Sequence, residues 1–372
     1  MSAEAKRPRW GQTPWTIDFR APSHALPSEV DFAIVGGGFT GLATAAWLRH
    51  LAPEKSVAVF EADDVGAGAS GHTGGLTLAE SAVGDLPGLG DVLKGFAEIL
   101  RTLAIDGDLT LPGVFELTRK KTASSPISWS DSGTLRVAEE VPGGTIDPGK
   151  LVSGLARAAE QAGAQIFEHV RVANVSFDEP LRLHIAGKEL RAEHLLFATN
   201  AQSLELSGLL GTTEPKFTLA MATGPLTAEA LAELGLASGK PFYTIDFPYL
   251  WGRLVAGGGM IFGSGLVHAN DWRELRALDI AAGEPAALLA KLDRRVHALH
   301  PVLRTVEITH RWGGPILIGE EWKPVFRQHP RSPRALVLGG YSGHGVALSV
   351  YLGRWAAEAM LGKRELPNWD KA

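Results

Sequence analysis

The stretch Val30–Gly41, VDFAIVGGGFTG, decides the fold of this chain. Its first half, Val30–Val35, is an apolar run rich in β-branched residues, which is typical of a buried parallel strand. Gly36, Gly38 and Gly41 follow with the spacing G-x-G-x-x-G, and a helical pattern continues after them. Glycines at this spacing permit a tight turn, the close approach of a pyrophosphate and close packing of helix on strand, and the helix start offers free N–H groups to a phosphate. The stretch therefore predicts the first half of a dinucleotide-binding unit.

A second strand and an acidic residue complete this unit. Ser56–Phe60, SVAVF, predicts the strand, and Glu61 follows it, twenty residues after Gly41. An acid at this place accepts a hydrogen bond from a ribose hydroxyl. The same carboxylate would repel a 2′-phosphate, so the pattern disfavours NADP. FAD and NAD are both compatible with it.

The glycine-rich stretch Gly66–Gly75, GAGASGHTGG, distinguishes FAD from NAD. A plain NAD dehydrogenase does not need a second glycine-rich segment directly after the acidic strand end. FAD is longer, and a second loop can hold its ribityl chain and flavin. The alternative is a flexible surface loop, but the apolar residues Leu76 and Leu78 favour a chain that re-enters the structure. We therefore expect FAD.

Composition narrows the class of protein. A chain of 372 residues is too long for one ordinary core, which predicts two. A hydrophobic content of 45% with 21% charged residues is typical of a soluble globular protein. The formal net charge of −5 lacks the basic excess of a nucleic-acid binder, and no apolar run is long enough for a membrane span. Met1–Trp10 has no apolar core behind its charges, so we do not expect a signal peptide.

The chain contains no cysteine. This excludes disulfides, thiolate metal sites, iron–sulfur clusters and redox-active cysteine pairs. A redox enzyme of this composition needs a bound organic cofactor to carry electrons, and we expect no metal. A cytoplasmic location is the simplest expectation, although a chain without cysteines would also suit an oxidising compartment.

The two ends of the chain predict elements of one sheet. Near the C-terminus, Arg334–Gly340 predicts a buried strand, followed by a glycine-rich turn and a helix that Gly362 closes. Between the ends, Asp147 is placed to cap a helix that ends at Gly163. Residues 211–327 are rich in tryptophan and proline and alternate like antiparallel strands.

These patterns predict an α/β fold in which a Rossmann-type FAD-binding domain is interleaved with a substrate domain. The substrate domain is expected to be α+β, with an antiparallel sheet. We predict that the FAD-binding domain comprises residues 1–85, 140–210 and 328–372. The substrate domain then comprises residues 86–139 and 211–327.

Seven motifs together carry a resemblance to a known family. They are VGGGFTGL, the acid Glu61, GASGHTGG, IDPGKLV, ATNA, HRWGG and GYSGHGV. Their order is typical of the D-amino-acid-oxidase-like FAD-dependent oxidoreductases, and the chain most resembles the branch of γ-glutamylputrescine oxidase and related amine oxidases. The resemblance covers residues from about 14 to 365. It implies a tightly held FAD and an antiparallel sheet that roofs the flavin.

The resemblance also implies which residues contact FAD. The pyrophosphate and adenosine side is assigned to Gly36, Gly38, Phe39, Thr40, Gly41, Glu61, Ala62, Val172, Ala198, Thr199 and Asn200. The ribityl and flavin side is assigned to Ser70, Gly71, His72, Thr73, Gly74, Gly75, Gly343, His344, Gly345 and Val346. The last four residues open the final helix, whose N-terminus would stabilise negative charge on a reduced flavin. For His344, a side-chain role and a backbone role are both open.

The substrate side departs from the family pattern. Amino-acid oxidases of this family often carry an arginine after the W-x-G element, where it binds the substrate carboxylate. Here Pro315 and Ile316 occupy that place, and Arg253 and Arg311 are the candidate substitutes. The residue types favour an ordinary surface or structural role for each arginine.

Aromatic residues are the candidates for the substrate roof. They are Tyr249, Trp251 and Trp312, by ring packing or cation–π contact. The catalytic residues are not identified by the sequence, and the candidates are Tyr249, Arg253, Trp312 and His344.

His72 is singled out by the letters H-T-G-G-L-T of His72–Thr77. Sarcosine and dimethylglycine dehydrogenases, distant members of the same superfamily, have H-A-A-G-L-T at this place and attach FAD through that histidine. The resemblance thus leaves two possibilities for His72, a covalent bond to FAD or a non-covalent contact.

The implied activity is an FAD-dependent amine oxidase or dehydrogenase. A neutral amine would lose hydride from its α-carbon to flavin N5, and water would hydrolyse the resulting imine. O₂ or an electron carrier would be the acceptor. The alternative is an oxidase or dehydrogenase of an amino acid or N-methyl amino acid of the sarcosine, glycine or proline type. Two other classes are an NAD-dependent dehydrogenase, which the second glycine-rich loop disfavours, and a flavin-binding protein without turnover.

Overall fold

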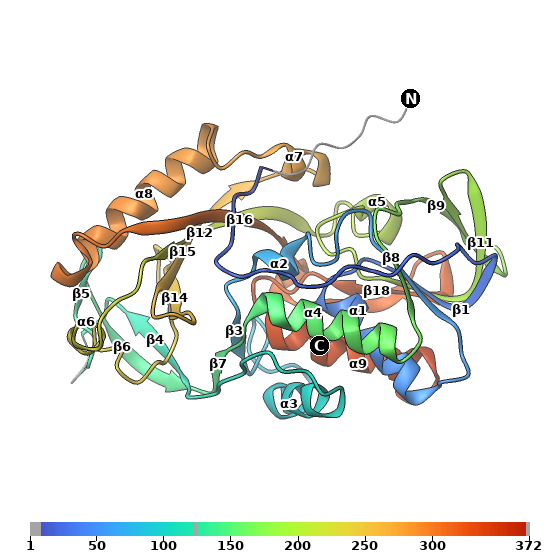
Figure 1. Cartoon of the computed structure of the whole chain (residues 1–372), viewed down its shortest axis with the longest axis horizontal. Coiled ribbons are helices and arrows are strands. Elements are labelled where there is room, and N and C mark those ends of the chain that lie inside the picture. The colour runs from blue at the N-terminus through green and yellow to red at the C-terminus, as the bar shows by residue number, and fades with distance from the viewer. Residues whose placement is uncertain (1–8, 122–124, 370–372) are drawn as a thin grey trace.

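Two large sheets lie at opposite ends of the molecule in the computed structural model (Figure 1), which describes residues 9–121 and 125–369. Outside the described residues lie the segments 1–8, 122–124 and 370–372. They include most of Met1–Trp10, for which no signal peptide is expected, and parts of both predicted domains. Within the described residues, no helix is long and apolar enough to cross a membrane.

The first sheet contains the predicted dinucleotide-binding unit. Its strand order is β17-β18-β11-β1-β2-β8, and β9 and β10 extend β11 on one side. The strands are β1 (Glu29–Val35), β2 (Val57–Phe60), β8 (Gln165–Phe167), β9 (Val172–Ser176), β10 (Leu181–Ile185), β11 (Lys188–Phe197), β17 (Val325–His329) and β18 (Ser332–Gly339). The five strands β18, β11, β1, β2 and β8 run parallel, as predicted for Val30–Val35.

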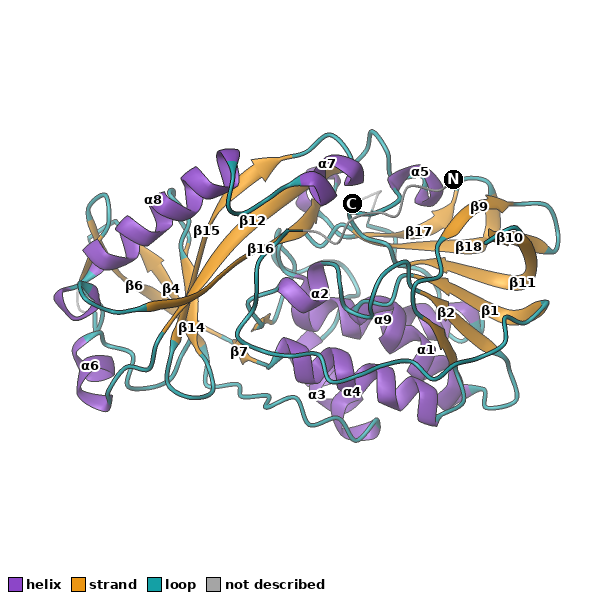
Figure 2. Cartoon of the chain, turned by 45° about the horizontal axis from the view of Figure 1, so that its top comes forward, coloured by secondary structure: helices purple, strands orange, loops and turns teal. Residues whose placement is uncertain are grey.

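Four helices gather on one face of this sheet (Figure 2). They are α1 (Phe39–Leu51), α3 (Val92–Thr102), α4 (Pro148–Gln161) and α9 (Gly345–Met360). The predicted boundaries of α4 are confirmed. The carboxylate of Asp147 accepts the Lys150 N–H at 2.9 Å, and Gly163 has a φ of +93°, which suits a residue just past a helix end.

The second sheet has the order β16-β12-β15-β14-β13-β4-β6-β5. Its strands are β4 (Val114–Thr118), β5 (Trp129–Ser130), β6 (Thr134–Val141), β12 (Glu214–Thr223), β13 (Phe242–Thr244), β14 (Trp251–Leu254), β15 (Met260–His268) and β16 (Ile308–Ile318). The sheet is antiparallel as expected, except that β13 and β4 pair in parallel. The helix α8 (Gly283–Leu299) covers one of its faces through apolar residues such as Leu289 and Leu292.

The remaining elements are short. They are α2 (Ala69–His72), β3 (Leu76–Leu78), β7 (Gly143–Thr145), α5 (Leu204–Ser207), α6 (Ala228–Glu233), α7 (Trp272–Ala277), η1 (Pro301–Leu303) and η2 (Glu320–Trp322). The strands of each large sheet come from segments far apart in the sequence. The first sheet is built from residues 29–60, 165–197 and 325–339, and the second from residues 114–141 and 214–318. The helix α3, which was assigned to the substrate domain, packs in the same core as α9. The domain boundaries and the cytoplasmic location stay predictions.

Candidate cofactor and substrate site

A cavity of about 1260 Å³ lies between the two sheets. The first sheet contributes the residues that follow β1, β2, β11 and β18, and the second contributes the residues that face them from β12, β14 and β16. Ligands of open α/β sheets bind outside the carboxyl ends of the strands, so this is the expected place for a dinucleotide. Most of the residues assigned to FAD from the sequence line this cavity, and the exceptions are Gly41, Gly71 and Gly75.

The turn after β1 requires glycine. Gly36 has a φ of +114°, and a Cβ on it would lie 2.5 Å from the carbonyl oxygen of Ala198. Gly41 does not line the cavity, but a Cβ on it would strike the carbonyl oxygen of Gly36. Gly41 therefore allows α1 to pack closely on the turn, while Gly36 lets the backbone reach the cavity.

Glu61 lies at the end of β2 and faces the same turn. Its carboxylate accepts the N–H of Gly37 at 2.8 Å and the N–H of Asp63 at 2.9 Å. Burial raises the pKa of the Glu61 carboxyl above its ordinary value. Ala62 and Val172 also line the cavity.

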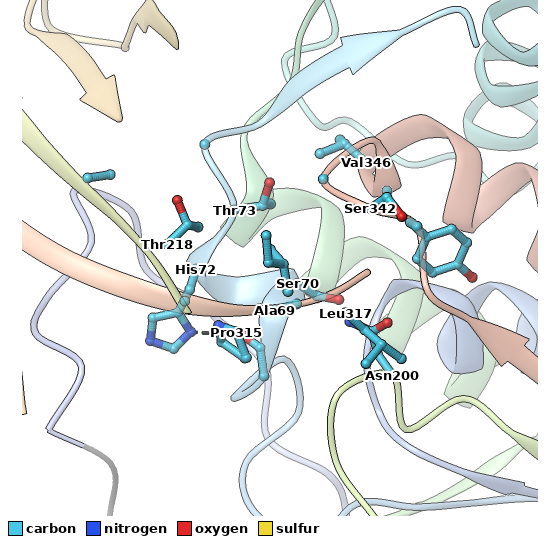
Figure 3. A pocket seen from close by; sticks show the side chains of 18 of the residues that line it. Ala69, Ser70, His72, Thr73, Asn200, Thr218, Pro315, Leu317, Ser342 and Val346 are labelled. Atoms are coloured by element: carbon cyan, nitrogen blue, oxygen red, sulfur yellow. Dashed lines mark hydrogen bonds between the residues drawn. The ribbon is translucent and has the colours of Figure 1, made fainter. Parts of the chain in front are cut away.

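The second glycine-rich loop forms α2 and the turn that follows it. Ser70, His72, Thr73 and Gly74 line the cavity. Figure 3 shows Ser70 and Thr73 in the same pocket as Asn200, Ser342 and Val346. Ser70 also joins the two glycine-rich turns, because its Oγ accepts the Phe39 N–H at 2.9 Å.

Gly71 and Gly75 shape the loop without reaching the cavity. A Cβ on Gly71 would strike the Gly66 carbonyl oxygen, and one on Gly75, whose φ is +76°, would strike that of Ile146. Their role is therefore backbone packing.

His72 is largely buried and is neutral near neutral pH, because burial lowers its pKa. Its Nδ1 lies 2.9 Å from the carbonyl oxygen of Gly68, so Nδ1 carries the proton and Nε2 the lone pair. The ring packs edge-on against Trp10 at 5.4 Å between centroids. The His72 carbonyl oxygen accepts the indole N–H of Trp312 at 3.0 Å, which ties the loop to the second sheet.

The start of α9 supplies the other side of the pocket. Gly343, His344, Gly345 and Val346 line the cavity. Burial lowers the pKa of His344, and its Nδ1 has no hydrogen-bond partner among the described residues. Thr199 Oγ1, which follows β11, is a second buried polar atom without such a partner, and Thr199 also lines the cavity. Two buried polar atoms of this kind indicate a polar ligand between the helix start and the sheet.

Aromatic side chains of the second sheet cover the loop. A Cβ on Gly74 would strike the Trp251 indole, so this ring lies directly against the loop backbone. Trp312 is 1% exposed and packs edge-on against Trp15 at 5.5 Å between centroids, so it belongs mainly to the core. Tyr249 is 40% exposed and lines the outer part of the cavity.

Neither candidate arginine lines the cavity. Arg253 is buried, and its guanidinium donates to the carbonyl oxygens of Gly74 and Leu254. Burial lowers its pKa to about 10. Arg311 pairs with Asp293 of α8 at 2.5 Å. These contacts fit structural roles.

Pro315 and Ile316, which replace the family's arginine, do line the cavity. Arginine and lysine side chains line the cavity as well, and they are Arg171, Arg276, Lys291, Arg294 and Arg295. Lys291 and Arg294 of α8 are exposed, whereas Arg276 pairs with Asp63 and Arg295 with Asp131. Within residues 9–121 and 125–369, no group of three or more histidine or acidic side chains is arranged to hold a metal ion.

Several lining residues were not found from the sequence. One of them is Tyr243, which lies on β13 beside Trp251 and whose hydroxyl donates to the Glu116 carboxylate. Another is Glu80, which follows β3. Tyr243 and Trp251 are cross-strand partners, and no local sequence pattern predicts that pairing. Trp10 reaches the cavity from the N-terminal segment.

That segment ties the loop to the second sheet. The carbonyl oxygen of Trp10 accepts the Gly313 N–H at 2.8 Å. The indole N–H of Trp15 donates to the Gly71 carbonyl oxygen at 2.9 Å.

Known proteins resemble the chain over most of its length. Gamma-glutamylputrescine oxidoreductase of Escherichia coli (strain K12) is 27% identical over 392 residues, which cover 93% of this chain and 87% of that protein. Glycine oxidase of Geobacillus kaustophilus (strain HTA426) is 26% identical over 374 residues, with 90% and 93% coverage. The crystal structure of glycine oxidase from Geobacillus kaustophilus superposes with a TM-score of 0.73 at 20% identity, covering 92% of this chain and 97% of that one, which shows the same fold.

The family model for FAD dependent oxidoreductases, DAO, matches residues 31–359. The match includes both glycine-rich loops, the cavity-lining strands of the second sheet and the start of α9. FAD is the cofactor of this family. The chain belongs to the DAO family of FAD dependent oxidoreductases.

Proposed function

We propose that this protein oxidises a C–N bond of an amine and that the resulting imine is hydrolysed by water. The observation that carries the proposal is the lining of the cavity beyond the glycine-rich loops. Aromatic and apolar residues, including Trp251, Pro315 and Ile316, cover this part of it. The name of the Escherichia coli relative supports an amine as the substrate class.

The residues present fit FAD. Gly36 and Gly38 leave the backbone open to a pyrophosphate, and Thr199 Oγ1 and His344 Nδ1 are buried polar atoms that need a partner. The N-terminus of α9 provides free N–H groups and a partial positive charge. When bound, FAD would supply the hydride acceptor.

The side chains of this chain would bind and orient the amine. Hydride loss requires the neutral amine, held in a fixed orientation, more than it requires a strong general base. Trp251 and the aliphatic side chain of Ile316 exclude water from the reacting carbon, and an apolar site favours the neutral form of an amine. The second candidate function, oxidation of an amino acid, is supported by the name of the glycine oxidase relative.

A panel of amines tests the proposal directly. We expect at least one primary or secondary amine to bleach the flavin under anaerobic conditions. NADH should not reduce it at a comparable rate, because the chain carries one G-x-G-x-x-G unit with its strand and acid. The measurement is flavin absorbance after mixing in a stopped-flow instrument. Rapid reduction by NADH, or no reduction by any amine or amino acid, would contradict it.

His72→Ala is expected to weaken FAD retention at least tenfold without unfolding the protein, because the substitution removes a largely buried ring that lines the cavity. The measurement is the ratio of flavin to protein after gel filtration. His24→Ala is the matched control, since His24 is a partly buried histidine that pairs with Glu160 away from the cavity. Acid precipitation of the wild type then decides between the two possibilities for His72. A yellow pellet indicates a covalent bond, and a colourless pellet with free FAD a non-covalent contact. Unchanged retention in His72→Ala would refute both.

A further inference from the structure

A buried carboxylate outside the FAD loops organises one wall of the cavity. Asp131 follows β5, and its side chain is only 4% exposed. It accepts hydrogen bonds from Arg295 of α8, from Nε at 2.8 Å and from Nη2 at 2.6 Å. It also accepts one from Nη2 of Arg119 at 2.5 Å. One carboxylate thus holds two largely buried guanidinium groups side by side.

Both guanidinium groups also bind the loop that joins β13 to β14, residues 245–250. Nη2 of Arg119 and Nη2 of Arg295 donate to the carbonyl oxygen of Pro248 at 2.9 and 2.8 Å. Nη1 of Arg295 donates to the carbonyl oxygen of Tyr249 at 2.7 Å. Arg119 also pairs with the Asp246 side chain. The two arginines bind the loop mainly through its backbone carbonyl oxygens. The position of the loop therefore does not depend on the side chains of Phe247 and Tyr249.

The side chains of this loop line the same cavity as the FAD loops. Phe247 is 75% exposed and Tyr249 is 40% exposed, and their ring centroids lie 4.3 Å apart. Ile245 and Leu266, which also line the cavity, are 49% and 38% exposed. Exposed apolar side chains gathered on the wall of a ligand cavity are typical of a binding surface. This surface is continuous with the cavity proposed for the reaction, so an extended substrate would reach it.

We propose that Asp131 is a positioning residue for substrate binding. Through Arg119 and Arg295 it fixes loop 245–250, and Phe247 and Tyr249 bind an apolar or aromatic arm of the amine, beyond the reacting carbon. The inference rests on the proposed function and narrows its substrate class to amines that carry such an arm.

The charge balance explains why Asp131 matters. In Asp131→Asn the two guanidinium groups still share the Pro248 carbonyl oxygen, and Arg119 keeps its pair with Asp246, but the carboxylate between the two groups is lost and Arg295 loses its carboxylate partner. Two close positive charges with little access to water repel each other, so one of them moves and releases the loop. The aromatic rings then lose their fixed position.

Two primary amines that differ only in the arm, n-butylamine and 4-phenylbutylamine, test the specificity. We expect Phe247→Ala to raise KM about tenfold for the phenyl compound and less than twofold for n-butylamine, with kcat for both within twofold. Asp131→Asn should show the same selective increase, and Asp131→Glu, which keeps the carboxylate, a smaller one. Asp293→Asn is the matched control, because it also removes a carboxylate that pairs with an arginine, here Arg311 of β16, but away from the loop. An equal rise in KM for both amines in Phe247→Ala would overturn the specificity.

Limited proteolysis tests the positioning without any turnover. Phe247 precedes a proline, so chymotrypsin should cut this loop after Tyr249. We expect the Tyr249–Leu250 bond to be cut at least tenfold faster in Asp131→Asn than in the wild type or in Asp293→Asn, with the flavin content unchanged. Equal cutting rates would overturn the positioning role. If no amine reduces the wild-type flavin, the proposed function fails and the substrate arm with it, while the cutting rates still decide whether Asp131 fixes the loop.

Discussion

Gly36→Ala is expected to yield a protein that purifies with less than a tenth of the wild-type FAD. The new Cβ would lie 2.5 Å from the Ala198 carbonyl oxygen, and the φ of +114° is unfavourable for alanine. The strain costs about 1–3 kcal/mol, and relieving it moves the turn that faces the predicted pyrophosphate. The measurement is the ratio of absorbance at the flavin band to protein absorbance, together with the thermal unfolding midpoint.

The control for this substitution is Gly224→Ala. Gly224 has an ordinary φ, and a Cβ on it would meet only Thr309, at 3.9 Å. We expect full FAD content and an unchanged midpoint for this variant. A Gly36→Ala protein with full FAD content would show that the turn does not need glycine.

The second large effect concerns an α-carboxylate on the substrate. We expect kcat/KM for n-butylamine to exceed that for norvaline, the same amine with an α-carboxylate, at least a hundredfold. The aliphatic side chain of Ile316 offers the substrate carboxylate no hydrogen-bond or charge partner. A carboxylate that is buried and unpaired costs several kcal/mol. A hundredfold difference in kcat/KM corresponds to only ~2.7 kcal/mol, so this cost is large enough to produce it. Arg253 does not compensate, because its donors already serve the carbonyl oxygens of Gly74 and Leu254.

Ile316→Arg is the matched variant for this prediction. It places a cation on the cavity wall and should reduce the preference for the amine at least tenfold, as measured by anaerobic flavin reduction with both compounds. A wild-type preference for norvaline by a hundredfold would instead support the amino-acid alternative.

The parts of the fold with a strong local signal were predictable. The run Val30–Val35 and the glycines after it give the first parallel strand and the turn, because burial on both faces and a positive φ leave few other choices. Asp147 and Gly163 mark the ends of α4 by their own chemistry. The return of the C-terminal strand to the first sheet also followed from composition, as the pairing of β18 with β11 confirms.

The parts that depend on tertiary contact were not predictable. The parallel pair β13–β4 joins strands that are distant in the sequence. The residues of neither strand indicate whether its partner runs parallel or antiparallel. From the sequence, Arg253 is a candidate for binding the substrate carboxylate. In the structure its guanidinium instead donates to the Gly74 carbonyl oxygen. Asp131 was missed altogether, because Arg119, Arg295 and loop 245–250 come from three separate segments.

The central place of β11 in the first sheet also matters for biosynthesis. β11 pairs with β1 along one edge. Along its other edge β10 covers Lys188–Ala192 and β18 covers Leu195–Phe197, and β18 is made after the other strands of this sheet. At ~5–20 residues per second, translation of the segment between β11 and β18 takes on the order of 10 s. During that time the edge of β11 at Leu195–Phe197 is without its partner, and an unpaired strand edge is a site of aggregation. The start of α9, which completes the cavity, is made later still, so the cavity is incomplete until the chain through α9 has been made.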